Sequence, residues 1–518
     1  MVHPKNSIVS NVFRLIVEVL LAVLTAGSAA AVTPASKLQP PAYGKPNFIV
    51  ILTDDLDLAS VEFMPKLKEL VTKHGTVFSN YFVTDSLCCP SRVSLLRGQY
   101  PHNHRVLSNA KPEGGFEKFY ELGEEQSTLA IWLKAAGYRT VLLGKYLNEY
   151  PGKQSLYVPP GWDEWYAVMD HRAVFFNYRL NENGRAVSYG HDANAYEADV
   201  LAAKTVDFIA RTSAGGKQPF FIYLAPSAPH VPAIPAPRHA EAFSHAAAPR
   251  TPAFNETDPS DKRHLSPLSP NDLQRLDRLY RMRLQSLLAV DDMVEKIVIA
   301  LQDQGLLDQT YIFFTSDNGF HLGEHRLKAG KGTAYEEDIH VPLIVRGPGV
   351  PPGKTLKQQV LNIDLGPTLA ELAGVHPPDF VDGRSFSPLL TGAPLAPPAW
   401  REDFVVEYWS PTPNRPRRDG LLRRWVASLV RSHSTPPESP ENASINLPDY
   451  VALRTKNHLY VERANGERKL YDLNADPHEL HNLIQSAAPG LIARLSERLA
   501  ALEHCAGASC RQNKARLL

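Results

Sequence analysis

One short apolar run decides the fold: Pro46-Asn47-Phe48-Ile49-Val50-Ile51-Leu52-Thr53, followed at once by Asp54-Asp55. An apolar run of this length is typical of a strand that is buried on both faces, as in a parallel sheet between layers of helices. In open α/β sheets, ligands bind at the edge where parallel strands end. The run therefore predicts an α/β fold and places a candidate site at Asp54 and Asp55.

Segments that resemble strands and helices alternate along the rest of the chain. Buried strands are predicted at 138–145, 220–225, 311–315 and 341–345, and helical spacing occurs at 64–74, 127–136, 195–211 and 271–301. Such alternation indicates a large, mostly parallel central sheet flanked by helices. After residue 374 the pattern changes to short strands at 404–408, 451–461 and 469–471 and a helix at 491–502. These predict a smaller C-terminal α+β subdomain with an antiparallel sheet.

The chain divides into four expected segments: a signal peptide at 1–31, a linker at 32–45, a catalytic α/β domain at 46–395 and the C-terminal subdomain at 396–518. Lys5 and Arg14 precede an apolar stretch at 15–24 and small residues at 28–31, which is the pattern of a cleavable signal. An uncleaved membrane anchor is the alternative. We expect an exported protein (secreted, periplasmic or lysosomal) with no stable membrane partner.

Charge and cysteine content narrow the function classes. The 55 basic and 55 acidic residues balance, whereas a nucleic-acid-binding protein usually carries a basic excess, so we expect no nucleic acid partner. Of the four cysteines, Cys505 and Cys510 could pair in an oxidising compartment. Cys88 and Cys89 would then have to join as neighbours, which is a strained arrangement. This favours a role other than a structural disulfide for Cys88 or Cys89.

Cys88-Cys89-Pro90-Ser91-Arg92 has the properties of a reactive site. Pro90 suits the first turn of a helix, so Cys88 is expected just before a helix N-terminus, where backbone N–H groups favour an anion. Arg92 adds a permanent cation one turn further on. A buried structural cysteine pair is the alternative interpretation.

Four residues with oxygen ligands stand at the ends of two predicted strands: Asp54, Asp55, Asp317 and Asn318. Ca²⁺ and Mg²⁺ take ligands of this kind. Carboxylates that converge repel one another at neutral pH, so a counter-ion is required if they meet. We therefore predict a divalent metal site, with ordinary capping and turn roles as the alternative.

The chain resembles the sulfatase family from Pro46 to Arg511. The general motifs stand in sulfatase order and comprise the strand with Asp54-Asp55, the Cys88 motif, Gly144-Lys145, Pro229-His230, Thr315-Ser316-Asp317-Asn318-Gly319 and the tail 470–479. The likeness is strongest to the N-acetylglucosamine-6-sulfatases, on residues 86–92, Tyr100-Pro101-His102-Asn103-His104, 144–150 and 362–368. The resemblance implies an alkaline-phosphatase-like α/β sandwich.

The resemblance also implies a role for each site residue. Cys88 is converted to formylglycine by a formylglycine-generating enzyme, and its aldehyde hydrate attacks the sulfate ester. Asp54, Asp55, Asp317 and Asn318, together with the group formed from Cys88, bind Ca²⁺, with Mg²⁺ as the alternative ion. Arg92 orients the hydrate, Lys145 and Lys331 neutralise sulfate charge, and His230 assists the leaving group.

One departure from the family concerns Leu147. Many arylsulfatases carry Lys-x-His where this chain has Lys145-Tyr146-Leu147, so the histidine that would deprotonate the second hydroxyl is absent there. Four histidines are candidates to replace it: His102, His104, His321 and His325. His321 and His325 could also form a zinc pair on a helix, but Gly319 and Gly323 argue against a helix.

The preferred hypothesis is a sulfuric ester hydrolase that acts on sulfated sugars such as 6-sulfated N-acetylglucosamine, or on aryl sulfates. Two alternatives stay open. One is a phosphomonoester or phosphonate hydrolase on the same scaffold, and the other is a non-catalytic protein that binds sulfated glycans.

Overall fold

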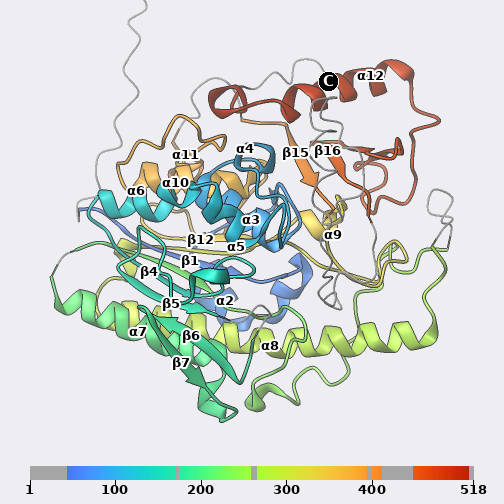
Figure 1. Cartoon of the computed structure of the whole chain (residues 1–518). Coiled ribbons are helices and arrows are strands. Elements are labelled where there is room, and N and C mark those ends of the chain that lie inside the picture. The colour runs from blue at the N-terminus through green and yellow to red at the C-terminus, as the bar shows by residue number, and fades with distance from the viewer. Residues whose placement is uncertain are drawn as a thin grey trace, which may run out of the picture. The chain divides into compact units, whose positions relative to one another are not determined.

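The computed structural model describes residues 44–169, 174–216, 218–257, 265–393, 400–410 and 447–512 (Figure 1). The predicted signal peptide at 1–31 and nearly all of the linker at 32–45 lie outside the described residues, as do residues 394–399 around the predicted domain boundary. The four-segment division therefore stays a prediction. Within the described ranges, no helix has both the length and the apolar character to cross a membrane.

A ten-stranded mixed sheet forms the centre of the fold. Its order is β13 (Lys354–Leu356), β2 (Thr76–Phe78), β12 (Leu343–Arg346), β9 (Thr310–Ser316), β1 (Asn47–Thr53), β8 (Phe220–Ala225), β4 (Arg139–Gly144), β5 (Glu164–Val168), β6 (Tyr178–Glu182) and β7 (Arg185–Tyr189). The five strands from β9 to β5 run parallel to one another. β12, β6 and β7 are antiparallel to their neighbours. The predicted α/β class is confirmed, with antiparallel strands added on both sides of the parallel centre.

Alternation along β1 divides the core into two layers. Phe48, Val50 and Leu52 pack into one buried cluster, while Ile49 and Ile51 face the other, because successive side chains of a strand point to opposite faces. The first layer contains α3 (Cys88–Arg97), α6 (Leu129–Ala135) and α10 (Leu365–Leu372), and the second contains α7 (Glu197–Ala214) and α8 (Pro270–Asp303). Figure 1 shows these two groups of helices on opposite sides of the sheet.

The helix that was predicted from Asn271 is α8. Ser269 and Asp272 form a capping box at its start, in which each side chain binds the backbone N–H of the other residue. This satisfies backbone donors that the first turn would otherwise leave unpaired. The helix runs for 34 residues, and its buried stripe packs against the sheet.

Helix α3 begins at Cys88, so Cys88 is the first helical residue and does not precede the helix as predicted. All ten residues of α3 are buried. Gly98 ends the helix in the left-handed conformation, at φ 67°, which glycine adopts without strain. Cys88 is thereby fixed at a helix N-terminus inside the core.

The remaining short elements connect these layers. Apart from short 3-10 turns, they are α2 (Pro65–Leu67) with a π turn at Lys68–Thr72, β3 (Tyr81–Phe82) paired with β14 (Val360–Leu361), α4 (Pro101–His104), α5 (Gly115–Glu121), β10 (His321–Leu322) paired with β11 (Ala329–Gly330), α9 (Glu336–Ile339) and α11 (Ser387–Thr391).

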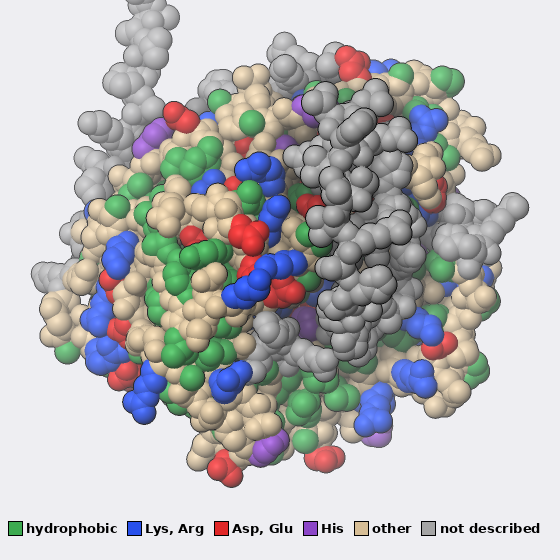
Figure 2. Space-filling model, in the orientation of Figure 1, with side chains coloured by type: hydrophobic (Ala, Val, Ile, Leu, Met, Phe, Trp, Pro, Cys, Tyr) green, Lys and Arg blue, Asp and Glu red, His purple; other side chains and the backbone are tan. Residues whose placement is uncertain are grey.

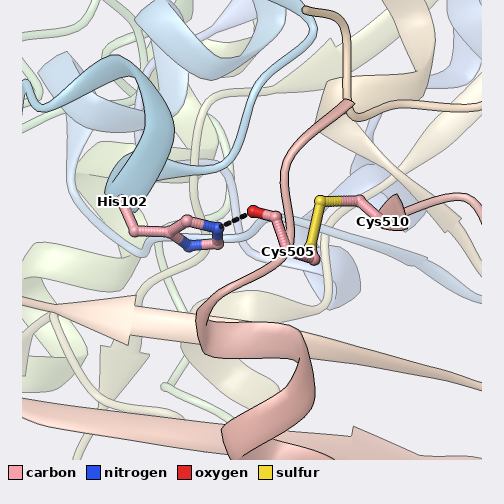
Figure 3. Close-up of side chains that lie close together, drawn as sticks. All are labelled: His102, Cys505 and Cys510. Carbon is pink, nitrogen blue, oxygen red and sulfur yellow. Dashed lines mark hydrogen bonds between the residues drawn. A yellow bond between two sulfur atoms is a disulfide. The ribbon is translucent and has the colours of Figure 1, made fainter. Parts of the chain in front are cut away.

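The C-terminal part contains a four-stranded antiparallel sheet, as predicted. Its strands are β15 (Asp403–Tyr408), β16 (Tyr450–Thr455), β17 (His458–Arg463) and β18 (Arg468–Asp472), followed by α12 (Pro489–Glu503). The disulfide between Cys505 and Cys510 is formed, and His102 of α4 binds the carbonyl of Cys505 at 3.0 Å (Figure 3). On the face drawn in Figure 2, acidic and basic side chains are interspersed, in keeping with the balanced composition.

Candidate active site

The ends of three parallel strands bring most of the predicted site residues together. Asp54 and Asp55 follow β1, Asp317 and Asn318 follow β9, and Lys145 follows β4. β1 is paired in register with β9, so that Thr53 lies opposite Ser316 and the two pairs that follow emerge side by side. The backbone N–H of Asp55 donates to Oδ1 of Asp317 at 3.0 Å.

The two aspartates after β1 each hold a lysine. Nζ of Lys145 lies 2.6 Å from Oδ2 of Asp54, and Nζ of Lys331 lies 2.5 Å from Oδ1 of Asp55. Lys331 comes from the loop after β11, which local sequence gave no reason to place here. Both aspartates are fully buried, so the ion pairs are formed with little competing water.

Cys88 lies against this acidic pair. Its Sγ is 3.4 Å from Oδ1 of Asp54 and 3.7 Å from Oδ1 of Asp55. Nζ of Lys331 is 2.8 Å from the same sulfur. Burial raises the pKa of the Cys88 thiol, and the charges of Lys145 and Lys331 offset this rise only in part. The unmodified thiol is therefore poorly suited to act as a thiolate nucleophile.

Arg92 connects the acidic pairs. Its Nε donates to Oδ2 of Asp317 at 2.8 Å, and its Nη2 lies 3.7 Å from Oδ1 of Asp54. Its Nη1 donates to the carbonyl of Lys145 at 2.9 Å. The guanidinium is fully buried, and one side chain thus fixes three of the predicted site residues relative to the helix that begins with Cys88.

His230 reaches the same place from the loop after β8. Its Nδ1 lies 2.7 Å from the carbonyl of Val231, which can only accept, so Nδ1 carries a proton. Its Nε2 lies 3.5 Å from Oδ2 of Asp55 and faces the site. Nε2 is therefore the nitrogen that could exchange a proton with a substrate.

The charges of this cluster keep Asp54 and Asp55 ionised. Burial alone would raise the pKa of Asp54, but Lys145, His230 and Arg92 outweigh burial and hold the pKa well below its usual value. For Asp55, Lys331 and His230 likewise overcome burial and lower the pKa to about 2. In Lys145, the opposing charges of Asp54 and Cys88 raise the pKa despite burial.

The donor set fits a hard divalent cation. Ligand atoms of Asp54, Asp55, Cys88 and His230 lie within 4.8 Å of one another. Among the described residues, Oδ1 of Asn318 and Oδ2 of Asp55 are buried and accept no hydrogen bond. Asn318 also donates to Oδ1 of Asp55 at 2.7 Å, which places its amide beside the acidic pair. Carboxylate and amide oxygens of this kind suit Ca²⁺ or Mg²⁺.

Asp317 differs from the other three oxygen residues. Its Oδ1 accepts from the N–H groups of Asp55 and Asn318, and its Oδ2 accepts from Arg92. Its oxygens could bind an ion only through their remaining lone pairs. Asp317 therefore connects the loop after β1 to Arg92 of α3 in this structure.

The four histidines considered in place of Leu147 have other partners. His102 lies 2.6 Å from Glu407, His104 binds Ser94 at 2.9 Å, and His321 binds Asp338 at 2.9 Å. His325 stacks on Tyr335 with a centroid distance of 3.7 Å. His321 lies in a strand, as expected from the argument against a helix. Leu147 itself is buried in the core.

Sequence reasoning missed Ser91 and Asn362 as parts of the site. The hydroxyl of Ser91 donates to the carbonyl of Asp317, and the amide of Asn362 donates to Oγ of Ser91 at 3.0 Å. Asn362 also accepts from the backbone of Thr84 at 3.2 Å. Both residues fall inside quoted motifs, but their contacts join segments far apart in the chain.

Comparisons with known proteins agree with this geometry. A family model described as Sulfatase matches residues 46–375. N-acetylglucosamine-6-sulfatase of Capra hircus is 38% identical over 496 residues, covering 90% of this chain and 85% of that protein. Arylsulfatase of Volvox carteri is 35% identical over 504 residues, covering 90% and 76%.

A solved structure described as BT4656 in complex with its substrate D-glucosamine-2-N,6-O-disulfate has a TM-score of 0.70 and 22% identity, and covers 91% of this chain and 99% of that chain. This likeness supports the α/β architecture alone. The family model and the two relatives extend over most of the chain, including both acidic pairs and the Cys88 motif. The chain therefore belongs to the sulfatase family.

Proposed function

We propose that this sulfatase removes 6-sulfate groups from N-acetylglucosamine or a related sulfated sugar, using a formylglycine made from Cys88 and a divalent ion, Ca²⁺ or Mg²⁺. The observation that carries the proposal is the position of Cys88, whose sulfur lies 3.4 Å from Asp54 and 2.8 Å from Lys331. The sugar specificity rests on the identity to N-acetylglucosamine-6-sulfatases, and aryl sulfates are expected as simpler substrates.

The formylglycine and the divalent ion would have separate tasks. A hydrated aldehyde would supply a hydroxyl nucleophile at the Cys88 position, and a divalent ion held by Asp54, Asp55, Asp317 and Asn318 would supply a Lewis acid for the sulfate oxygens. Oδ1 of Asn318 and Oδ2 of Asp55, which are buried and accept no hydrogen bond from the described residues, support an ion at this place.

The surrounding cations bind and orient the sulfate. A sulfate ester carries its negative charge before reaction and redistributes it in the transition state, so fixed positive groups that need no reorganisation stabilise that state. Lys145 and Lys331 supply two such charges, and each lysine is held in place by its own aspartate, Asp54 or Asp55. Arg92 holds Asp54 and Asp317 in place and thereby fixes the direction from which the nucleophile faces the sulfate.

His230 is the proposed proton donor to the leaving alcohol. The carbonyl of Val231 fixes the orientation of its ring through Nδ1, so Nε2 faces the acidic pair. A charged imidazolium carries a proton on Nε2 and can deliver it to the oxygen of the leaving sugar.

Maturation and export follow from the same proposal. A formylglycine-generating enzyme is the expected maturation partner for Cys88. The N-terminal residues 1–31, with basic residues before an apolar stretch, support export, so we propose that the enzyme works outside the cytosol on sulfated carbohydrate.

Two measurements test the proposal. Mass spectrometry of the peptide that contains Cys88 should find it lighter than the cysteine form by one sulfur and two hydrogens and heavier by one oxygen. Sulfate release from a panel of defined sulfated sugars should be greatest for a 6-sulfated glucosamine residue. Active protein with an intact Cys88 thiol would overturn the modification, and a preference for 2-, 3- or 4-sulfates would overturn the assigned position.

A further inference from the structure

Arg283 is a buried cation that lies beside the candidate metal site without belonging to any motif described above. It occupies the middle of helix α8 and is fully buried. A guanidinium cannot lose its proton inside a protein, so burial requires that its donors be used or its charge be balanced. Its partners are therefore informative.

Three of these partners are hydrogen-bond acceptors on two of the loops that form the site. Nη2 of Arg283 donates to the backbone carbonyl of Asp55 at 2.5 Å and to Oδ2 of Asp57 at 3.1 Å. Nη1 donates to the carbonyl of Pro229 at 3.1 Å, the residue directly before His230. The guanidinium thus joins the loop after β1 to the loop after β8.

The third loop is contacted through an aromatic ring. The guanidinium carbon of Arg283 lies 4.2 Å from the centroid of Phe320, two residues after Asn318. A cation over an aromatic face is attracted by the ring quadrupole, more strongly where water is excluded. One side chain on a single rigid helix therefore contacts all three strand-end loops, which carry Asp55, His230 and Asn318.

The contact between Arg283 and Asp55 affects how the Asp55 carboxylate is presented to the proposed metal ion. Asp55 has a φ of 65°, a left-handed conformation that residues other than glycine adopt only where the surroundings hold them. Its N–H is held by Asp317 and its carbonyl by Arg283, so both sides of this residue are fixed. The direction of its carboxylate depends on these two bonds.

We propose that Arg283 is a positioning residue, which sets the mutual geometry of the Asp55, Asn318 and His230 loops and so tunes divalent ion affinity. The inference rests on the proposed metal site. Arg283 contacts none of the proposed ligand oxygens, and at Asp55 it binds the backbone carbonyl, so it acts through the backbone and not by competing for the ion. Loss of such a supporting contact typically costs about 10–100-fold in metal affinity.

The test compares Arg283→Lys with the wild-type protein. Lysine keeps the charge but has no fork, so it cannot donate to Asp55, Asp57 and Pro229 at once. Calcium binding to chelator-treated protein is measured by isothermal titration calorimetry, and turnover of an aryl sulfate is measured across calcium concentrations. We expect the Kd for Ca²⁺ to rise by about 10–100-fold. At saturating calcium, kcat should fall while KM stays within about threefold.

The matched control is Arg498→Lys. Arg498 is also buried and also uses its fork, donating to both oxygens of Asp403 at 2.7 and 2.8 Å, but it lies on α12 beside β15. Both variants should lower the melting temperature, whereas only Arg283→Lys should change calcium affinity.

The outcomes separate the two proposals. Wild-type protein that binds no calcium or magnesium would overturn the metal site itself. Wild-type binding together with unchanged affinity in Arg283→Lys would overturn the positioning role and leave the metal site intact. If Arg283→Lys does not fold, Phe320→Leu provides the second measurement, since it removes the cation–π contact and keeps apolar volume. A rise in the Kd for Ca²⁺, smaller than the one expected for Arg283→Lys, would then support the proposal, and an unchanged Kd would overturn it.

Discussion

Lys145 and Lys331 carry the same charge but hold different aspartates. Removal of either lysine would leave its buried aspartate without its nearest cation. Both lysines are also proposed to face the sulfate. Because both aspartates are fully buried and the two lysine side chains are largely buried, the charge of either lysine acts at short range with little screening. The contribution of either lysine to catalysis is therefore best measured against the replacement of a lysine outside the site.

Replacing Lys145 or Lys331 with Met should lower kcat by about 10²–10³-fold, or ~3–4 kcal/mol of transition-state stabilisation. Methionine fills similar volume without charge, so the loss reports the cation. The control is Lys134→Met, whose ammonium lies 2.7 Å from Asp163 with 43% of its side chain exposed. Steady-state kinetics with an aryl sulfate measures all three variants. Equal activity of the Lys145 and Lys134 variants would contradict the assigned role.

The two adjacent cysteines offer a matched pair. Cys88→Ala should abolish sulfate release, because the proposed nucleophile is made from this residue. Cys89→Ala removes an equally buried thiol, whose pKa burial raises to about 12, and should keep activity within about tenfold while costing ~1 kcal/mol of stability. Activity assays and the mass of the Cys88 peptide distinguish them. If Cys88→Ala released sulfate at the wild-type rate, Cys88 would be excluded as the source of the nucleophile.

At the scale of elements, the strands of the sheet centre were predictable because their signal is local. The run at 48–52 is continuously apolar, and it became β1 with every residue buried. The hairpin of β6 and β7 was missed because its second strand is largely exposed and carries no such run. The turn at Asn183-Gly184, where both residues have positive φ, was the signal available for it.

The site was predictable to the extent that it follows strand ends. Asp54, Asp55, Asp317 and Asn318 met as expected because β1 and β9 are parallel neighbours. The partners of His102, Arg283 and Asn362 were not predictable, since they lie on segments far away along the chain. His102 and Glu407, for example, are 305 residues apart. Local patterns carry no information about which of several buried polar groups will pair at that separation.

His102 joins α4 to β15 and to the segment after α12, and it makes the stability of the fold depend on pH. It binds Glu407 of β15 and the carbonyl of Cys505 from its place in α4 (Figure 3). Burial would lower the pKa of His102, but the charge and hydrogen bond of Glu407 overcome burial and raise it from 6.5 to about 9. The raised pKa means that the folded state binds the proton more tightly than the unfolded state.

The stabilisation from His102 should be complete below pH 6.5 and should be lost as pH rises toward 9. Its full size is about 3 kcal/mol, from ~1.4 kcal/mol for each pKa unit. His102→Gln should therefore lose more stability at pH 6 than at pH 9.5 in urea unfolding under non-reducing conditions. His245→Gln, at an exposed position, is the control and should show no such difference. A loss for His102→Gln that is independent of pH would refute the charged pair.

At the scale of the whole molecule, the charge balance of the site decides how the protein should respond to removal of the proposed metal ion. Asp54, Asp55 and Asp317 contact the cations Arg92, Lys145 and Lys331, with His230 beside Asp55. Positive side chains therefore already balance the three carboxylates. The two large clusters of buried hydrophobic residues extend through both layers and contain none of the charged residues of this site. The fold should not depend on the ion for its core.

Chelation should accordingly abolish activity while the protein stays folded. A ligand that binds only the folded state adds about 2.7 kcal/mol when its concentration is 100 times its Kd, so its removal should lower the melting temperature by only a few degrees in a chain of this size. Scanning calorimetry and far-ultraviolet circular dichroism, with and without chelator, measure both effects. Adding Ca²⁺ or Mg²⁺ back should restore activity together with the melting temperature, and the ion that does so at the lower concentration is the better fit to the site. Unfolding at 25 °C on chelation, as in small zinc domains whose folding depends on the metal, would show instead that Arg92, Lys145 and Lys331 do not balance the acidic residues and that the ion is part of the fold.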